Sequence, residues 1–174
     1  LAGRCQGVAY VGHRFQPMGW ENTADLGLSI GCFWSYADSR MHWFDAYTVE
    51  DTVRSFVMAR SYLVSFNGIA FAFPLMQELL HNQADRLADD EGAEILAADL
   101  RDLCRTFRQF YTTSYDLLAE ISKHDPESQG RHGINSLDAI SQANGLGATR
   151  SHAAQAPRDW QAGRVAQVIE YCLD

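Results

Sequence analysis

Cysteine and histidine are the residue types in this chain best suited to metal or nucleophilic chemistry. There are four cysteines and six histidines, at Cys5, Cys32, Cys104 and Cys172 and at His13, His42, His81, His124, His132 and His152. The cysteines form no CxxC pair and the histidines no HExxH pattern, which disfavours a zinc site. No G-x-S-x-G segment occurs, so a nucleophilic serine is not indicated. The wide spacing and apolar neighbours of the cysteines predict reduced, mostly buried thiols and a cytoplasmic or otherwise intracellular protein.

The acidic charge of the chain bears on the partners that it can bind. The sequence has 14 Lys and Arg against 22 Asp and Glu, a formal net charge of −8. Proteins that coat nucleic acids neutralise phosphates with Lys and Arg, so this balance argues against that class. It leaves a nuclease possible, because an acidic site can meet phosphate through bound metal ions.

The length and hydropathy of the chain predict one globular domain. The sequence has 174 residues and 47% hydrophobic content, enough to bury a core. No apolar run approaches the ~20 residues that a membrane-spanning helix needs. The sequence starts without Met and ends directly after a helical pattern, so we expect it to be trimmed at both ends.

Strand patterns come first along the chain and helical patterns follow. Leu26–Trp34 alternates with period two, which predicts a strand with Trp34 on its apolar face. The segment "MHWFDAY" returns from it as a hairpin, and "SYLVSF" reads as a strand buried inside a sheet. The other predicted elements are a strand at Gly7–Val11, a loop at Phe15–Thr23, helices at Glu91–Tyr111 and Tyr115–Ile121, and a final helix opened by Pro157. This order predicts an α/β domain whose mixed sheet is flanked by helices.

Two stretches resemble a known family. Phe66–Met76, "FNGIAFAFPLM", resembles the second motif of the DEDD 3′–5′ exonuclease superfamily, N-x-x-x-F-D-x-P-x-L. Asp159–Cys172, "DWQAGRVAQVIEYC", resembles its third motif, a helix with Y-x-x-x-D. Shorter pieces in the same order extend the resemblance over nearly the whole chain. It implies a ribonuclease-H-like fold, one exonuclease-like domain over residues 1–174, and four carboxylates that hold two Mg²⁺ or Mn²⁺ ions.

The first two motifs depart from the family pattern. The first is a strand that ends in D-x-E, yet Gly7–Val11 leads into His13 and Arg14 with no carboxylate. The second motif has aspartate where this chain has Ala72. By their place in the motifs, Asn67, His13 and Arg14 are candidate substrate contacts in a cleft made cationic. The alternative for His13 and Arg14 is an ordinary surface turn, which we favour.

The third motif keeps Tyr171, which in the family orients the attacking water. Its partner aspartate falls one residue past the end of the chain, and the adjacent Asp174 points along another helical direction. Tyr171 and Asp174 are therefore vestigial catalytic candidates. Asp116, in "SYDLLAEI", is a weak candidate for a surviving metal ligand, but Asp at a helix start favours the dipole, so helix capping is preferred. Asp138 is likewise interpreted as a residue of a helix start that favours the helix dipole.

The tryptophans could stack on nucleic-acid bases. Trp34 lies on the apolar face of a predicted strand and Trp160 on that of a predicted helix, so both are predicted to be core residues. The roles of Trp20 and Trp43 stay open.

Three hypotheses follow for the function. The first is a catalytically inactive exonuclease-like domain that binds a protein or a nucleic acid, needs no metal, and exposes an apolar patch for its partner. The second is an active Mg²⁺- or Mn²⁺-dependent 3′–5′ exonuclease that recruits other carboxylates, such as Asp25, Asp116 or Asp174, or in which Ala72 is an engineered substitution. The third is an unrelated small-molecule or structural domain. We favour the first, because at least three of the four expected ligands are missing.

Overall fold

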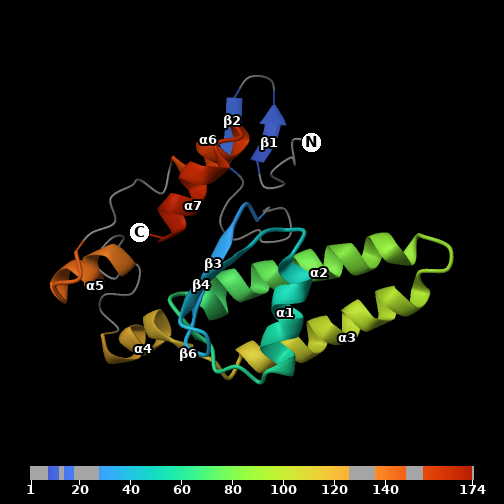
Figure 1. Ribbon diagram of the computed structural model, residues 1–174, viewed down its shortest axis with the longest axis horizontal. Helices are drawn as coiled ribbons and strands as arrows, with labels where there is room; N and C mark the ends of the chain where they lie inside the picture. Colours follow the sequence, from blue (N-terminus) through green and yellow to red (C-terminus); the bar gives the residue numbers. More distant parts are fainter. Residues whose placement is uncertain (1–7, 12–13, 18–27, 126–135, 148–154, 174) are drawn as a thin grey trace.

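The computed structural model describes residues 8–11, 14–17, 28–125, 136–147 and 155–173. Helices predominate among them, and the class is mixed α/β (Figure 1). The elements in chain order are β1 (Val8–Val11), β2 (Arg14–Pro17), β3 (Gly31–Ser35), β4 (Arg40–Phe44), α1 (Val49–Met58), β5 (Val64–Ser65), the π-helix η1 (Gly68–Ala72), α2 (Phe73–Ala88), α3 (Glu94–Tyr111), β6 (Tyr115–Asp116), α4 (Leu117–His124), α5 (Leu137–Ala143), α6 (Ala156–Gln161) and α7 (Val165–Leu173).

The strands of the described residues form three separate pairs. β1–β2 and β3–β4 are antiparallel hairpins, whereas β5–β6 is parallel. The coarse prediction of an α/β class is thus confirmed. In the same ranges, no helix is both long enough and apolar enough to cross a membrane.

The core is helical. Figure 1 shows α2 and α3 as a long antiparallel hairpin with α1 lying across it. Their buried side chains recur at intervals of three and four residues, as expected of helices that each bury one stripe. The core contains Phe44, Val49, Val53, Phe56, Phe73, Met76, Leu80, Ala84, Leu100, Leu103, Cys104, Phe107 and Tyr111. At its centre the ring of Phe107 meets the rings of Phe73 and Tyr111 edge-on, with centroids 6.0 and 5.1 Å apart.

The β3–β4 hairpin packs one of its two faces on this core. Phe33 points inward, where its ring meets that of Phe56 on α1 edge-on at 4.9 Å. Because neighbouring side chains on a strand point to opposite faces, Trp34 points away from α1. The prediction that Trp34 is a core residue is therefore wrong, and 49% of its surface is exposed. Gly31 is required by close packing, since a Cβ there would lie 2.3 Å from the ring of Phe44.

Three other predicted elements differ from the observed ones. The buried strand predicted for "SYLVSF" shrinks to β5, and Val64 within it is 59% exposed, since β5 pairs only with β6. Arg14–Pro17 pairs with β1 where a loop was predicted; residues 18–23 of that loop lie outside the described ranges. The single final helix is two helices, α6 and α7, because the chain turns at Gly163 with φ of 73°.

The helix predicted for Glu91–Tyr111 begins at Glu94. Ile95 and Leu96, two apolar residues near the start of this helix, are 84% and 59% exposed. They lie in the first turn of α3, and the buried stripe begins only with Ala97 and Leu100.

Candidate functional site

Asp116 is the only buried charged side chain among the described residues, with 3% of its surface exposed. It ends β6 and is the N-cap of α4. The parallel register places Ser65 of β5 directly opposite Asp116. The chain then runs from Ser65 into η1 and α2, so Asp116 faces the start of the motif at Phe66–Met76.

Both carboxylate oxygens of Asp116 accept several hydrogen bonds. Oδ1 accepts from the backbone N–H groups of Asn67 at 3.0 Å, Leu118 at 3.0 Å and Ala119 at 3.2 Å. Oδ2 accepts from the Ser65 hydroxyl at 3.0 Å and from the Ile69 N–H at 2.9 Å. One side chain thus ties β5, η1 and α4 together. The helix capping expected of Asp116 is confirmed.

These hydrogen bonds also set the ionisation of Asp116. Burial is the largest single influence, and it opposes the charged form. The donors from Ile69, Ala119, Asn67 and Ser65 act in the other direction, and together they hold the pKa of Asp116 below its ordinary value. The carboxylate therefore remains ionised at neutral pH, and its charge is satisfied by donors of the chain itself.

The backbone around Asn67 adopts an unusual shape that brings its donors to Asp116. Asn67 has a left-handed conformation, with φ of 62° and ψ of 21°, which Asn adopts more readily than most residues. The π-helix η1 follows and leads directly into α2, whose first turn contains Pro74. π-helical turns are rare in proteins as a whole, and those that do occur are often found at functional sites. Asn67 contributes its backbone N–H to this arrangement.

Gly68 has no room for a side chain. A Cβ added there would lie 2.4 Å from the Ser65 hydroxyl oxygen and 2.8 Å from the Phe73 ring. We expect Gly68→Ala to lower the free energy of unfolding by about 2 kcal/mol, because overpacking forces these neighbours apart. Chemical denaturation measures the loss. The matched control is Ala72→Ser, an exposed position at the other end of η1, which should change stability by less than ~0.5 kcal/mol.

Ala72 lies at the end of η1, and its methyl group is exposed. Of the other predicted site residues, Tyr171 lies half-buried on α7. Its pKa is raised, first by burial and then by Cys172 and Asp138. Arg14 lies on β2. His13, Asp25 and Asp174 are outside the described ranges, as are Cys5 and Trp20.

The candidate residues that the structure describes form no metal-binding cluster. Within the described ranges, no three side chains of the types His, Cys, Asp and Glu are placed to share a metal ion. Asp138 lies in the first turn of α5, as the sequence predicted.

Comparison of the chain with protein-family models, curated proteins and solved structures found no match.

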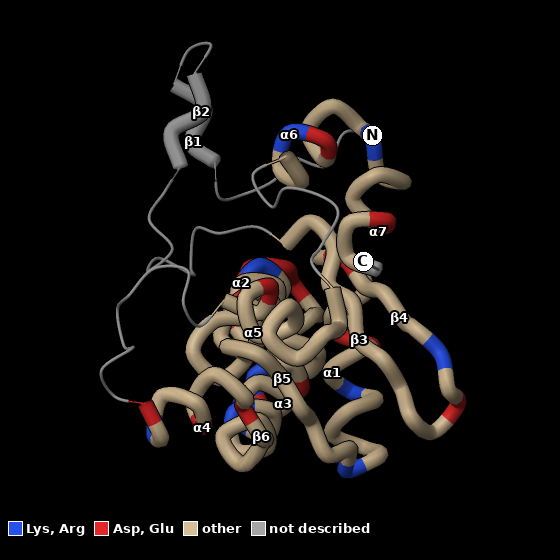
Figure 2. Tube along the Cα trace, turned by 90° about the vertical axis from the view of Figure 1, so that its left-hand side faces the viewer, with Lys and Arg blue, Asp and Glu red and all other residues tan. Residues whose placement is uncertain are grey.

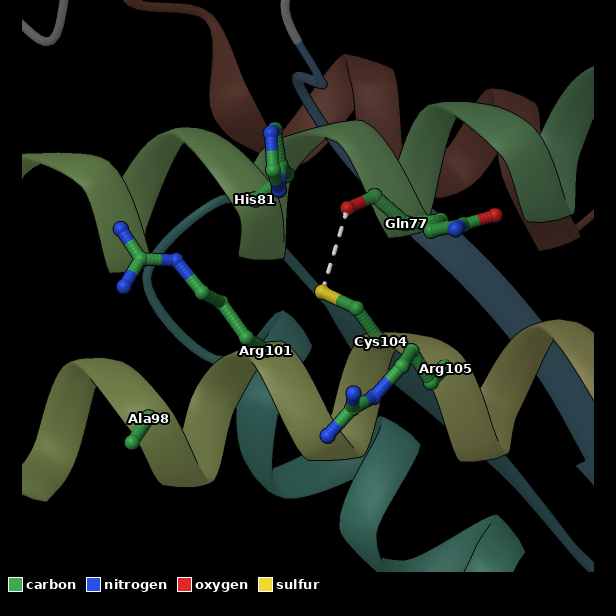
Figure 3. Close-up of a pocket in the computed structure, with 6 residues that line it drawn as sticks. All are labelled: Gln77, His81, Ala98, Arg101, Cys104 and Arg105. Carbon is green, nitrogen blue, oxygen red and sulfur yellow. Dashed lines mark hydrogen bonds between the residues drawn. The ribbon is translucent and has the colours of Figure 1, made fainter.

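A cavity of about 470 Å³ lies between α2 and α3 (Figure 3). It is lined by Gln77, His81, Ala98, Arg101, Cys104 and Arg105. The two arginines already have carboxylate partners, because Arg101 pairs with Asp85 at 3.0 Å and Arg105 with Asp102 at 2.9 Å. The cavity is therefore a poor phosphate site, despite its basic lining. In the sequence, this basic lining was indicated by two arginines four residues apart on one helix.

The outward side of the β3–β4 hairpin was missed by sequence reasoning. Cys32 lies opposite Trp43, and Trp34 lies opposite Met41, so these four residues share one face, which we term the outer hairpin face. Trp34 is 49% exposed, Trp43 56% and Met41 41%. A sequence pattern that indicates this face was present in the second strand, where Met41 and Trp43 alternate with residues that point inward. Exposed aromatic side chains gathered on one face mark binding surfaces more often than chance.

Proposed function

We propose that this chain is a catalytically inactive 3′–5′ exonuclease-like domain that binds another protein through the outer hairpin face. The proposal retains the resemblance to the DEDD superfamily and the ribonuclease-H-like sheet that it implies. In support, the antiparallel hairpin β3–β4, the helix α1 and the strand β5 follow one another along the chain, and β5 pairs in parallel with the later strand β6. The helix α1 contacts the hairpin at Phe33, and α7 contacts β3.

The hydrogen bonds around Asp116 are the observation that best supports a catalytically inactive domain. A carboxylate has about four lone-pair sites, and five donors of the chain already point to this one. A metal ion at Asp116 would have to displace hydrogen bonds that join three elements. At the motif position where the resembled family has aspartate, Ala72 offers only a methyl group.

The charge distribution favours a protein partner over a nucleic acid. Single strands bind to aromatic side chains that are flanked by Lys and Arg, which follow the phosphates. From Gly31 to Phe44 the charged residues are Asp38 and Arg40, both near the turn (Figure 2). Within the hairpin itself, the outer hairpin face therefore carries no Lys or Arg. Such a face fits an apolar or aromatic segment of a protein.

Metal binding and nuclease activity test the inactive reading together. We expect calorimetric titration with Mn²⁺ to show no binding, and labelled single-stranded DNA and RNA to stay intact in the same samples. The Ala72→Asp variant should behave in the same way, because one restored carboxylate is short of the set that two ions need. Binding of two ions with shortening of the strand from its 3′ end would overturn the proposal. Activity in Ala72→Asp alone would show that the remaining ligands are in place.

Selection from a random displayed-peptide library tests the proposed interface. We expect the protein to retain peptides rich in apolar and aromatic residues, and the Trp34→Ser, Trp43→Ser double variant to lose them. The control is Tyr47→Ser, a more exposed aromatic position (81%) outside the hairpin, which should retain them. Peptide binding that does not depend on the two tryptophans would contradict the proposal. Quenching of tryptophan fluorescence by oligonucleotides at moderate salt would favour a nucleic-acid partner instead.

A further inference from the structure

The chain contains two asparagine–glycine pairs, Asn67–Gly68 and Asn144–Gly145. Asparagine followed by glycine is especially prone to deamidation, because glycine has no Cβ to hinder attack by its backbone nitrogen on the asparagine side chain. The two asparagines have similar ψ angles, 21° at Asn67 and 9° at Asn144. The surroundings of each pair therefore decide which one reacts in the folded protein.

The Asn67–Gly68 pair is held by distant parts of the chain. The Asn67 N–H donates to Oδ1 of Asp116 at 3.0 Å, and the Asn67 carbonyl accepts from the Phe71 N–H at 3.0 Å. Gly68 is buried, and a Cβ there would collide with the Ser65 hydroxyl. The backbone can rotate to the reacting geometry only when η1 opens, and that opening breaks the hydrogen bond from η1 to Asp116.

The Asn144–Gly145 pair lies just after α5, a helix of seven residues with no buried side chain. Both residues are exposed, and a Cβ at Gly145 would meet no atom within 4 Å. The Asn144 side-chain amide donates to the Ile140 carbonyl at 2.8 Å, and the Gly145 N–H donates to the Gln142 carbonyl at 3.0 Å. These hydrogen bonds belong to the end of one short helix, and helix ends open at little cost in free energy.

We propose that Asn144 is a deamidation site of the folded protein, at which water converts the side-chain amide into a carboxylate, and that the fold protects Asn67 from the same reaction. The site goes beyond the proposed function and does not depend on it. The two pairs have the same attacking nitrogen and the same leaving group. The cost of opening the surrounding structure is what distinguishes them.

The reaction balances as a hydrolysis. The Gly145 backbone nitrogen loses its proton and attacks Cγ of Asn144, which forms a cyclic imide. The bond from Cγ to the side-chain nitrogen breaks, and ammonia leaves with the proton. One water then opens the imide at either of its two carbonyls. The product is aspartate or isoaspartate at position 144, and no group is oxidised or reduced.

The product fits the end of α5 less well than asparagine does. A carboxylate cannot donate the hydrogen bond that the amide of Asn144 gives to the Ile140 carbonyl. The last turn of α5 contains no basic residue, and the helix dipole places negative charge at this end. Isoaspartate also adds a carbon to the main chain, which displaces the Gly145 N–H from the Gln142 carbonyl. Deamidation therefore loosens the end of α5.

Incubation at mildly alkaline pH, followed by peptide mapping that separates aspartate from isoaspartate by mass spectrometry, tests the site. In the folded protein we expect conversion at Asn144 to be at least ~10-fold faster than at Asn67. In denaturant the two rates should agree within about threefold, because neither pair is then held. Asn144→Gln should remove the reaction, since the longer side chain places its carbonyl carbon one bond further from the Gly145 nitrogen.

The Asp116→Asn variant tests the protection of Asn67. It weakens the acceptor that holds the Asn67 N–H, so conversion at Asn67 should become faster while that at Asn144 stays unchanged. Equal rates at the two asparagines in the folded protein would overturn the proposal. It would also be overturned if Asn144 stayed intact under conditions in which the denatured protein reacts, or if the ratio of the two rates were the same with and without denaturant.

Discussion

Replacement of Asp116 by alanine is expected to lower the free energy of unfolding by about 3–5 kcal/mol, among the larger effects that a single substitution produces. The variant removes one acceptor group that serves five donors. Four of these are backbone N–H groups that belong to η1 and to the first turn of α4. Each buried donor without a partner costs about 1–3 kcal/mol, although water relieves part of that cost.

Thermal unfolding of Asp116→Ala, Asp116→Asn and the parent protein measures this effect. The alanine variant should unfold about 10 °C below the parent. The asparagine variant keeps one acceptor oxygen and the shape of the side chain, so its loss should be smaller. Equal losses would mean that the negative charge matters and the number of accepted hydrogen bonds does not. A loss below ~1 kcal/mol in the alanine variant would contradict the role of Asp116 as the link between the three elements.

The pH dependence of stability gives a second measure of Asp116. The folded protein holds the pKa of this group below its ordinary value of 3.8. The ionised carboxylate therefore contributes stability that is present above that value and is lost as the pH falls through the lower, folded-state pKa. The stability difference between the parent and Asp116→Asn should be constant near neutral pH and shrink in acid. A difference that stays constant down to the acid unfolding transition would contradict the lowered pKa.

Sequence periodicity predicted the helices well where a whole stripe of side chains is buried. The core residues of α3 recur at helical spacing, so hydrophobicity alone located that helix. The same reasoning misplaced Trp34, because a strand of alternating apolar residues has two apolar faces and the pattern does not say which one meets the core. Cys32 and Trp34 were assigned inward, whereas Phe33 makes the contact with α1.

The candidate site was predictable only in part. Asp116 was singled out because Asp before a helical pattern caps helices, and that role depends on local sequence. Its bonds to Ser65, Asn67 and Ile69 depend on the pairing of β5 with β6, which brings together residues about fifty positions apart. Residue spacing does not encode contacts of this kind.

Replacement of Phe107 by alanine is expected to cost about 3–5 kcal/mol of unfolding free energy. Phe107 is fully buried on α3, where its ring lies edge-on to Phe73 and Tyr111. The loss combines the apolar surface of the ring, the cavity left behind, and the two aromatic contacts. Denaturant titration monitored by circular dichroism should show a lower midpoint with an unchanged slope, because the native fold is kept.

Ile95→Ala on the same helix is the matched control for Phe107→Ala. Both side chains are large and apolar and both lie on α3, yet Ile95 is 84% exposed and Phe107 is fully buried. The Ile95 variant should stay within ~0.5 kcal/mol of the parent, and its stability should increase if anything, since alanine has the higher helix propensity. A loss at Ile95 comparable with that at Phe107 would mean that the first turn of α3 is covered in solution. Ile95 would then belong to a second apolar contact surface, in addition to the outer hairpin face. The pair of variants therefore separates core residues from contact residues along a single helix.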